Sequence, residues 1–589
     1  MNYKNCKMNK LNVFTKISFV LLWMGVFSCK NTDDNPNPDS NNSDENQVTI
    51  DTTYDPTYPD RAATIGFFLN NWQAKEFVLP SNVKPYEGTS GDADVTVTVN
   101  MNDVVTKVSK YVYGNNSNTW MGQMVDQPKL LQYIKDLSPH IIRAPGGSIS
   151  DIYFWNELSA PPSDAPAQLL DGDGNEVPGD YWFGKNTADW TLSIDHYYQV
   201  LQQTNSEGII TVNYAYARYG TGSHPVQTAA HLAAEWVRYD NGRTKYWEVG
   251  NENNGNWEAG YRIDVSNNQE GQPEIITGKL YGKHFKVFAD SMRAAASEIG
   301  STIYIGAQLL DEPGEAWQTA TDKNWNEGVL TEAGETADYF VTHDYFTDYY
   351  TDASPKEILS TGVTVPEDIM DYFDDLFSEY SIKPKPIALT EWNIFSEGSQ
   401  QMVSDIAGIH AAIVLGELIQ NKFGEASRWD LANGWDDGND QGMFNNGDEP
   451  DAPKWNPRPA FYYMYYFQKT FGDRMVASSV DGSSDILCYA SSFGKGEAAG
   501  LVLINTGKTV EKVRINIQHF SAGNHFYWYS LQGGSGKFSR KVLVNGQGTQ
   551  GVSGGPLDYA TLPAHKTKYD QGIFLTVEPK SVIYINVPK

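Results

Sequence analysis

The sequence predicts an α/β protein in which a (β/α)8 barrel carries an accessory antiparallel β-sandwich. Three observations predict this fold. The chain has 589 residues, more than one ordinary core accommodates. Between about residues 111 and 472, short apolar runs alternate with longer helical stretches, which is the order of repeated βα units. After about Asp473, strand-like runs separated by glycine-rich turns follow one another without helices, as in a β-sandwich.

Eight apolar runs in the alternating region are candidates for barrel strands. They are Tyr111–Gly114, Ile141–Pro145, Gly208–Asn213, Lys245–Gly250, Ile303–Gly306, Tyr339–His343, Pro386–Thr390 and Ala426–Trp429. Helical stretches lie between most of them, such as Gln227–Tyr239, His284–Ile299 and Asp405–Gln420. Eight such units predict a closed barrel over residues 111–472.

Strands are also expected on both sides of the barrel in the sequence. The alternating run Val95–Val99 predicts one strand, and Lys107–Tyr113 predicts another. Since these precede the barrel, residues 61–110 are expected to join partly the sandwich of residues 473–589. The sandwich strands expected there are Ile486–Ala490, Ala499–Asn505, Val510–Ile517, Phe526–Ser530, Ile573–Val577 and Val582–Val587.

The N-terminus is typical of an exported lipoprotein. Four lysines precede the apolar run Ile17–Phe27, which is too short to span a bilayer and fits a secretory signal. The run ends at Ser28-Cys29, so we expect a signal peptide over residues 1–28 and lipidation of Cys29. Residues 29–60 are rich in Asn, Asp and Pro, which predicts a disordered tether. The expected location is the outer membrane, at the cell surface, with the lipid as the only membrane contact.

Composition restricts the partners. The formal net charge of -29 argues against nucleic acid, because phosphate binding needs a basic surface. The chain has three cysteines, Cys6, Cys29 and Cys488, so neither a disulfide framework nor a Cys/His zinc site is expected. No metal or cofactor motif stands in the required context. The acidic runs near Asp171 and Asp436 are interpreted as a turn and a solvated loop.

Two glutamates follow barrel strands. Glu252 comes directly after strand four in Gly250-Asn251-Glu252, and Glu391 comes directly after strand seven. Catalytic residues of barrel enzymes lie at these C-terminal strand ends. A pair of carboxylates at one barrel mouth is what glycoside hydrolysis requires. Glu248 lies within strand four and is expected to point elsewhere.

Other strand ends carry polar and aromatic side chains that suit a sugar site. Arg143, at the end of strand two, can hold a carboxylate nucleophile ionised. The adjacent Pro145-Gly146-Gly147 lets the backbone approach the pocket closely. At the end of strand six, His343 or Tyr345 can orient the nucleophile or contact hydroxyls. Trp429 and Trp435, at strand eight and its loop, can stack on a sugar ring.

These motifs resemble clan A of the glycoside hydrolases, and the layout is most similar to family 51 α-L-arabinofuranosidases; families 30, 39, 79 and 86 are near alternatives. The resemblance rests on Arg143, Asn251-Glu252, His343 with Tyr345, and Glu391-Trp392-Asn393. It implies that Glu252 is the acid/base, Glu391 the nucleophile and Asn251 the partner of the sugar 2-hydroxyl. Two features depart from family 51: Thr390 stands where Asp is usual, and the loop Asn156–Asp189 is enlarged.

The leading hypothesis is therefore a retaining glycosidase that cleaves plant or algal cell-wall polysaccharide or oligosaccharide. The alternative is a non-catalytic glycan-binding lipoprotein on a barrel scaffold. Adhesion or a purely structural role would predict repeats, which the sequence lacks. The sequence leaves open the sugar and linkage, endo or exo action, a neutral or sulfated substrate, the oligomeric state and a structural calcium.

Overall fold

The computed structural model describes residues 51–88, 91–349, 351–396 and 398–589. The expected signal peptide, Cys29 and most of the expected tether lie outside these residues. Across the described ranges, no helix has the length and apolar character needed to cross a membrane.

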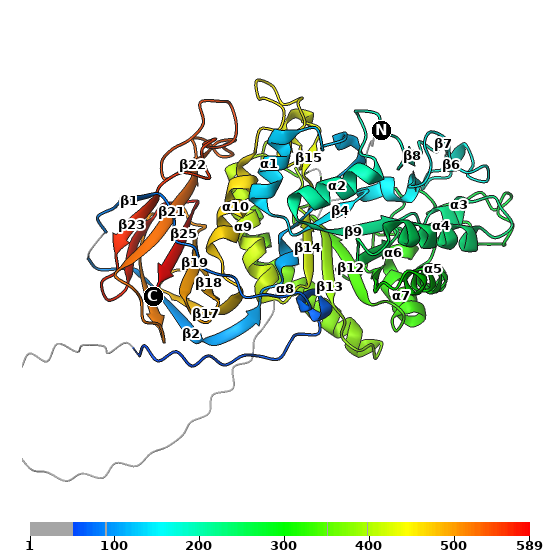
Figure 1. Cartoon of the computed structure of the whole chain (residues 1–589). Helices are drawn as coiled ribbons and strands as arrows, with labels where there is room; N and C mark the ends of the chain where they lie inside the picture. The colour runs from blue at the N-terminus through cyan, green and yellow to red at the C-terminus, as the bar shows by residue number, and fades with distance from the viewer. Residues whose placement is uncertain (1–50, 89–90, 350, 397) are drawn as a thin grey trace, which may run out of the picture. The chain divides into compact units, whose positions relative to one another are not determined.

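Eight parallel strands close into a barrel in the order in which they occur along the chain (Figure 1). They are β3 (Gly114–Asn116), β4 (Ile141–Ala144), β9 (Glu207–Val212), β10 (Tyr246–Val249), β11 (Tyr304–Gln308), β12 (Tyr339–Asp344), β13 (Ile387–Trp392) and β14 (Glu425–Arg428). The predicted (β/α)8 barrel is confirmed, and all eight strand positions fall within a few residues of the apolar runs.

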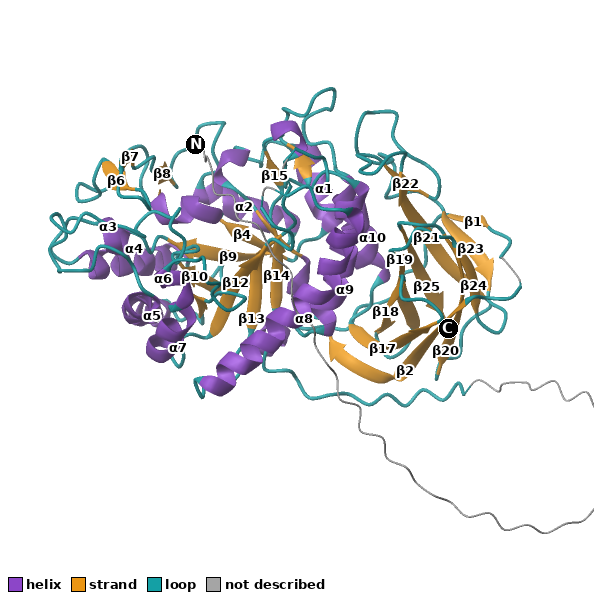
Figure 2. Cartoon of the chain, turned by 180° about the vertical axis from the view of Figure 1, so that it is seen from behind, coloured by secondary structure: helices purple, strands orange, loops and turns teal. Residues whose placement is uncertain are grey.

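Helices follow the barrel strands and surround them (Figure 2). The main ones are α1 (Pro128–Leu137), α2 (Ile194–Thr204), α4 (Pro225–Asp240), α5 (Gly278–Glu298), α7 (Trp325–Ala333), α8 (Pro355–Glu379), α9 (Asp405–Gln420) and α10 (Pro459–Thr470). Short elements decorate the loops: α3 (Tyr216–Tyr219), α6 (Ala320–Lys323), η3 (Thr119–Met121), η4 (Gly147–Ile152), η5 (Asp436–Gly438), β5 (Tyr153–Phe154), β6 (Gln168–Leu170), β7 (Glu176–Pro178), β8 (Trp182–Phe183), β15 (Ala432–Asn433) and β16 (Phe444–Asn445).

The first barrel strand begins later than the sequence predicts. Residues Lys110–Tyr113 form the short helix η2, which the hydroxyl of Ser109 caps by accepting from the Tyr111 amide at 3.3 Å. The strand starts at Gly114, where any Cβ would come within 2.5 Å of Ser427 Oγ. The close approach of β14 therefore requires glycine at this position, and the apolar run Tyr111–Tyr113 packs against β14 and α9 rather than extending the strand.

Residues near the N-terminus close the opposite end of the barrel from the predicted site. The short helix η1 (Gly66–Leu69) packs into a cluster with residues at the N-terminal ends of the strands. Phe67 stacks on Tyr304 with ring centroids 3.8 Å apart, and Phe68 packs against Tyr246 at 4.9 Å. Of residues 61–110, expected to join the sandwich in part, Val83–Pro85 form the strand β1.

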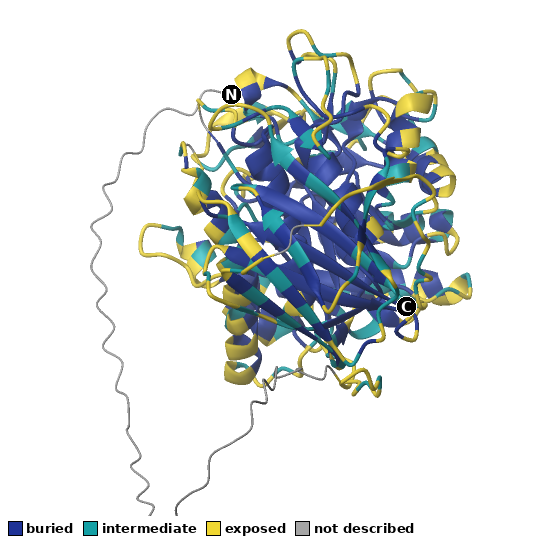
Figure 3. Cartoon of the chain, turned by 90° about the vertical axis from the view of Figure 1, so that its left-hand side faces the viewer, coloured by how far each residue is buried: buried dark blue, intermediate teal, exposed yellow. Residues whose placement is uncertain are grey.

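An eleven-stranded sheet forms the second part of the fold. Its strands are β1, β2 (Val95–Lys107), β17 (Arg474–Asp481), β18 (Ile486–Phe493), β19 (Ala498–Asn505), β20 (Glu511–Gln518), β21 (His525–Gly533), β22 (Val542–Val544), β23 (Ala564–Lys568), β24 (Ile573–Val577) and β25 (Ser581–Pro588). The buried side chains of its two halves meet in one core, as in a sandwich, and Figure 3 shows these buried strands.

The strand β2 links the sequence before the barrel to this sheet, as predicted. Its buried residues alternate from Val95 to Met101, and it pairs with β17 and β20. The separate strand predicted over Lys107–Tyr113 is wrong, because β2 continues to Lys107 and then ends. Residues 51–60, expected in the tether, contact this sheet: Thr57 forms a bridge with Asp103 of β2.

The sheet contacts the barrel through the two helices that follow strands seven and eight. The helix α9 contacts β2 and β21, and α10 contacts β19 and β25. Tyr489 of β18 donates to Glu417 of α9 at 2.7 Å, and Tyr584 of β25 donates to the carbonyl of Tyr463 at 2.7 Å. The sheet thus fixes the helices behind β13 and β14, whose ends carry part of the site.

Candidate active site

The predicted site residues come from five strand ends at one mouth of the barrel. Arg143 lies in β4, Glu252 follows β10, His343 lies in β12, Glu391 lies in β13 and Trp429 follows β14. Because all eight strands are parallel, these ends lie on the same face. Glu391 is the penultimate residue of β13, not the first residue beyond it. Irregular register in β13 accompanies this position: Leu389 pairs with Ala426 but Trp392 with Arg428.

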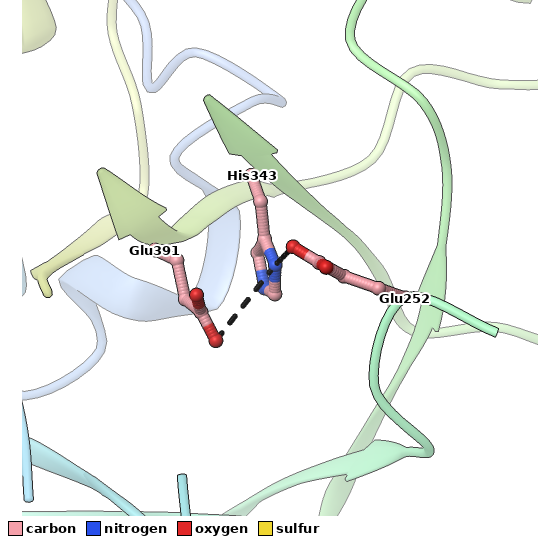
Figure 4. A group of neighbouring side chains, drawn as sticks. All are labelled: Glu252, His343 and Glu391. Carbon is pink, nitrogen blue, oxygen red and sulfur yellow. Dashed lines mark hydrogen bonds and ion pairs between the residues drawn. The ribbon is translucent and has the colours of Figure 1, made fainter. Parts of the chain in front are cut away.

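Figure 4 shows that Glu252, His343 and Glu391 point toward one another. The Nδ1 atom of His343 lies 2.7 Å from Glu252 Oε1 and 3.9 Å from Glu391 Oε1. One oxygen of each glutamate and one nitrogen of the histidine all lie within 4.8 Å of one another. Among the described residues, this is the one His/carboxylate cluster spaced as metal ligands are, and its atoms are engaged by the hydrogen bonds described here.

A hydrogen bond joins His343 to Glu252. The Nδ1 atom of His343 faces Glu252, and its Nε2 atom lies 3.1 Å from Thr390 Oγ1, whichever nitrogen carries the proton. Burial alone would raise the pKa of Glu252, but the hydrogen bond and charge of His343 lower it below its usual range. Burial alone would lower the pKa of His343, but the charges of Glu391 and Glu252 raise it. Both shifts are those expected for an ion pair between Glu252 and His343.

Glu391 is held by a donor on each oxygen. Arg143 Nη1 donates to Oε1 at 2.7 Å, and the Tyr345 hydroxyl donates to Oε2 at 2.6 Å. The Glu391 side chain is only 4% exposed. Burial, and then the charge of Glu391, raise the pKa of Tyr345 well above its usual range, so this hydroxyl stays a donor. These two donors fix the orientation of the carboxylate.

Arg143 is the centre of a buried network. Besides Glu391, it donates to Glu248 at 2.7 Å, to Asn251 Oδ1 at 2.8 Å and to Asn116 Oδ1 at 3.1 Å. The expectation that Glu248 points elsewhere is therefore wrong: its fully buried carboxylate faces into the barrel and balances the guanidinium. Burial alone would lower the pKa of Arg143, but Glu248 and Glu391 raise it above its usual range.

The backbone at Glu252 has a conformation that other residues must hold in place. Its φ of 42° lies in the left-handed region, which is costly for a side chain of this size. Asp151, on the loop after β4, accepts from the Asn253 side chain at 2.7 Å and from the Asn251 amide at 3.4 Å. Gln308 accepts from the Asn253 amide at 3.0 Å. The turn is therefore clamped on both sides of Glu252.

Glu258 adds a further buried carboxyl group beside this turn. Glu258 Oε1 accepts from Ser148 Oγ at 2.6 Å and from Asn251 Nδ2 at 3.1 Å, and its side chain is 2% exposed. Burial, and then the charge of Asp151, raise the pKa of Glu258 well above its usual range. With Arg143 on Oδ1 and Glu258 on Nδ2, Asn251 has a fixed orientation and one N–H hydrogen left for a ligand.

The two predicted tryptophans have different surroundings. The ring of Trp429 covers Gly147, where a Cβ would lie 2.7 Å from it, so the glycine turn admits this indole beside β4. Trp435 packs against the guanidinium groups of Arg540 and Arg458, at 5.1 and 5.8 Å from its ring centroid. These contacts give Trp435 a packing role, and its contact with a sugar stays a prediction.

Several residues of the site were not predicted. Asn116 ends the first strand and Asn118 lies two residues beyond it, and the strand-end rule identifies both once β3 is shifted to Gly114–Asn116. Trp257 lies five residues after Glu252 and donates through Nε1 to Glu252 Oε2 at 3.1 Å. Asp151 and Glu258 lie inside long loops, and no local pattern marks them.

Solved structures of other proteins share the fold of this chain. The α-L-arabinofuranosidase of Thermotoga maritima, in complex with arabinose, shares the fold over 84% of this chain and 100% of its own, with a TM-score of 0.58 and 18% identity. A family 44 xyloglucanase from Paenibacillus polymyxa has a TM-score of 0.53 and 12% identity, over 84% and 99% of the two chains. Residues 133–349 match the family described as alpha-L-arabinofuranosidase 1 domain. The chain is therefore similar to α-L-arabinofuranosidases over residues 133–349 and shares their fold over most of its length.

One curated protein extends this relationship. An intracellular exo-alpha-(1->5)-L-arabinofuranosidase from Acetivibrio thermocellus is 23% identical over 246 residues. The match spans 40% of this chain and 41% of that protein. Thr390, which departs from the family 51 pattern, supplies the hydroxyl that lies 3.1 Å from His343 Nε2.

Proposed function

We propose that this protein is a retaining glycosidase that cleaves plant or algal cell-wall polysaccharide or oligosaccharide, with Glu252 as acid/base and Glu391 as nucleophile. The observation that carries this proposal is the separation of the two carboxyl groups, whose nearest oxygens lie within 4.8 Å. Retaining enzymes have carboxyl groups about 5–5.5 Å apart, whereas inverting enzymes need about 6.5–9.5 Å to admit a water. The gap between Glu252 and Glu391 fits direct attack by one carboxylate.

In the first step, an oxygen of Glu391 attacks the anomeric carbon while the bond to the leaving oxygen breaks. Arg143 and Tyr345 hold the attacking carboxylate in place, each by donating to one of its oxygens. The leaving oxygen takes the proton held between Glu252 Oε1 and His343 Nδ1. The products are a glycosyl ester on Glu391 and a free hydroxyl on the leaving group.

In the second step, Glu252 removes a proton from a water molecule, and the water oxygen attacks the anomeric carbon of the ester. The bond to Glu391 breaks, the sugar is released with its original configuration, and the proton returns to the Glu252–His343 pair. Asn251 supports both steps, because its one uncommitted N–H is positioned to donate to a sugar hydroxyl.

The names of the related arabinofuranosidases make α-L-arabinofuranosides the first substrates to test. The xyloglucanase has a similar fold at 12% identity, so xyloglucan belongs in the same panel. Trp257, hydrogen-bonded to the proposed acid, is positioned to contact the leaving group of whichever substrate is cleaved.

We also propose that the protein is anchored in the outer membrane through a lipid on Cys29 and acts at the cell surface. This rests on the signal-like run Ile17–Phe27 and the polar stretch after Cys29. The Acetivibrio thermocellus relative is named an intracellular enzyme, so this location does not derive from it. Labelling cells with palmitate tests it: the full chain should take up label, and Cys29→Ser should abolish it. Equal labelling of both would refute the anchor.

The catalytic proposal is tested on protein lacking residues 1–29. The substrates are arabinan, arabinoxylan, xyloglucan and mixed-linkage glucan, together with 4-nitrophenyl glycosides of the same sugars. Release of reducing ends by the parent should fall by several orders of magnitude in Glu391→Ala. Glu235→Ala is the matched control, since this glutamate lies 44% exposed on α4. A parent that binds a glycan without cutting it would support the alternative of a non-catalytic binding protein.

A further inference from the structure

Exposed tryptophans occur in one part of this protein. Among the described residues, the tryptophans with large exposed area are Trp190, Trp257 and Trp317, at 57%, 57% and 71%. Each lies in the loop after a different barrel strand, namely β4, β10 and β11. Tyr349, 52% exposed, lies in the loop after β12. All four side chains, called the aromatic rim below, therefore belong to the face that carries Glu252 and Glu391.

Exposed rings on several loops of one face are candidates for a binding surface, because large aromatic side chains are mostly buried. Their flat apolar faces and polar edges suit ligands that are partly apolar and partly hydroxylated. A sugar ring, with C–H groups on its faces and hydroxyls on its rim, is such a ligand.

Part of the rim is connected to the acid/base. Trp257 donates directly to Glu252. The loop of Trp317 joins the same region, because Asn254 donates to Asp322 at 3.0 Å at the end of that loop. Two exposed indoles therefore lie on adjacent loops beside the proposed proton donor.

Another part of the rim is connected to the nucleophile. The Tyr345 ring, whose hydroxyl binds Glu391, stacks on Phe395 with centroids 4.3 Å apart. Phe395 in turn contacts Tyr349 at 4.7 Å. An unbroken series of aromatic contacts thus runs from Glu391 out to Tyr349. On the enlarged loop after β4, Trp190 packs against Trp182 at 5.6 Å.

The charge around the rim favours an uncharged ligand. The arginines nearest the strand ends, Arg143, Arg218 and Arg428, are at most 1% exposed and bind protein acceptors. The loop of Trp317 carries Asp311, Glu312 and Glu315, and the loop of Tyr349 carries Asp348 and Asp352, of which Asp352 pairs with Lys537 at 3.8 Å. Carboxylates at the mouth repel sulfated or uronic acid chains.

We infer that the aromatic rim provides sugar-binding subsites beyond the cleaved bond, which hold several units of a neutral polysaccharide so that the enzyme cuts within the chain. This inference rests on the proposed glycosidase function. It deepens that function by assigning a neutral polymer as substrate and internal cleavage as the mode of action.

The test compares a polymer and a small substrate on the same variants. The substrates are linear arabinan and 4-nitrophenyl α-L-arabinofuranoside, with the corresponding xyloglucan and aryl glucoside pair as second set. Trp317→Ala and Tyr349→Ala should lower kcat/KM on the polymer about fivefold or more and change the small substrate by about twofold or less. Trp317→Phe, which keeps a ring, should retain most of the polymer activity. Tyr58→Ala is the control, since Tyr58 is 51% exposed and contacts Arg474 of the sheet.

The outcomes separate the two proposals. Early products from the polymer should be a mixture of oligosaccharides. Monosaccharide as the sole early product, or an equal loss on both substrates in the alanine variants, would overturn the inference and leave the glycosidase proposal intact. Cleavage of carrageenan or fucoidan but of no neutral polymer would overturn it as well. A parent that cleaves nothing would instead refute the proposed function.

Discussion

Replacing Arg143 should both destabilise the fold and abolish activity. In Arg143→Met, the carboxylates of Glu248 and Glu391 lose bonds of 2.7 Å each while remaining 0% and 4% exposed. Removing one partner of a buried ion pair leaves an uncompensated charge and costs about 3–5 kcal/mol. The loss of the donor on the proposed nucleophile should lower kcat/KM about 100-fold or more.

The matched control for this variant is Arg238→Met. Arg238 also binds two carboxylates, Glu298 at 2.7 Å and Glu235 at 2.8 Å, but its side chain is 30% exposed. Surface ion pairs contribute about 0–1 kcal/mol, so this variant should lose no more than about 1 kcal/mol. Urea unfolding followed by tryptophan fluorescence measures both. The double variant Arg143→Met with Glu248→Met should recover part of the stability and none of the activity. Equal losses in Arg143→Met and Arg238→Met would refute the reasoning.

Three further predictions follow from the site. Tyr345→Phe, which removes the 2.6 Å bond to Glu391, should lower kcat/KM about 10- to 100-fold with an unchanged melting temperature; an unchanged rate would contradict the role of the hydroxyl. Glu252→Ala should lose activity on poor leaving groups, and added azide should restore turnover of an aryl glycoside as a glycosyl azide of retained configuration; failure of rescue would argue against Glu252 as acid/base. Finally, the Glu252–His343 pair should stabilise the fold over a defined pH range. The pKa of Glu252 is lowered from 4.5, so its contribution to stability is full above pH 4.5 and is lost as the pH falls through the folded pKa. The pKa of His343 is raised from 6.5, so its contribution is full below pH 6.5 and is lost as the pH rises through the folded pKa. The difference in unfolding free energy between the parent and His343→Gln should therefore be largest between about pH 4.5 and 6.5, and a difference that does not vary with pH would contradict the ion pair.

The barrel could be predicted because its strands are short buried runs that any periodicity analysis detects. Val212, Val249 and Leu389 are all fully or almost fully buried, and Val212 and Val249 each end a strand that a loop with polar residues follows. The exception is β3, where only Gly114–Asn116 forms the strand. These residues are not apolar, so no hydrophobic run marks the strand in the sequence. Its pairing with β4 and β14 fixes it instead.

The site was predictable where a residue lies at a strand end, and not elsewhere. Arg143, Glu252, His343, Tyr345 and Glu391 were identified from position alone, and the structure brings them together. The inward turn of Glu248 was missed because a strand residue faces the barrel interior or the helices according to register, and an acidic side chain in an apolar strand gives no indication of which.

The loop residues were missed for a different reason. Asp151 and Glu258 contact the acid/base turn across 100 and 7 residues of sequence, through bonds to Asn251 that depend on how two long loops fold. Neither position has a spacing or a neighbouring motif that marks it. Only the tertiary contacts reveal that the left-handed backbone at Glu252 is supported from behind by these carboxyl groups.

The stereochemistry of the first-formed product tests the central claim most directly. The claim is that Glu391 attacks the sugar itself, because its carboxylate and that of Glu252 lie too close together to admit a water between them and the anomeric carbon. Proton NMR of a fresh reaction with an aryl glycoside, recorded before mutarotation, reveals the anomer released. The account predicts the same configuration as in the substrate, and release of the opposite anomer would contradict it.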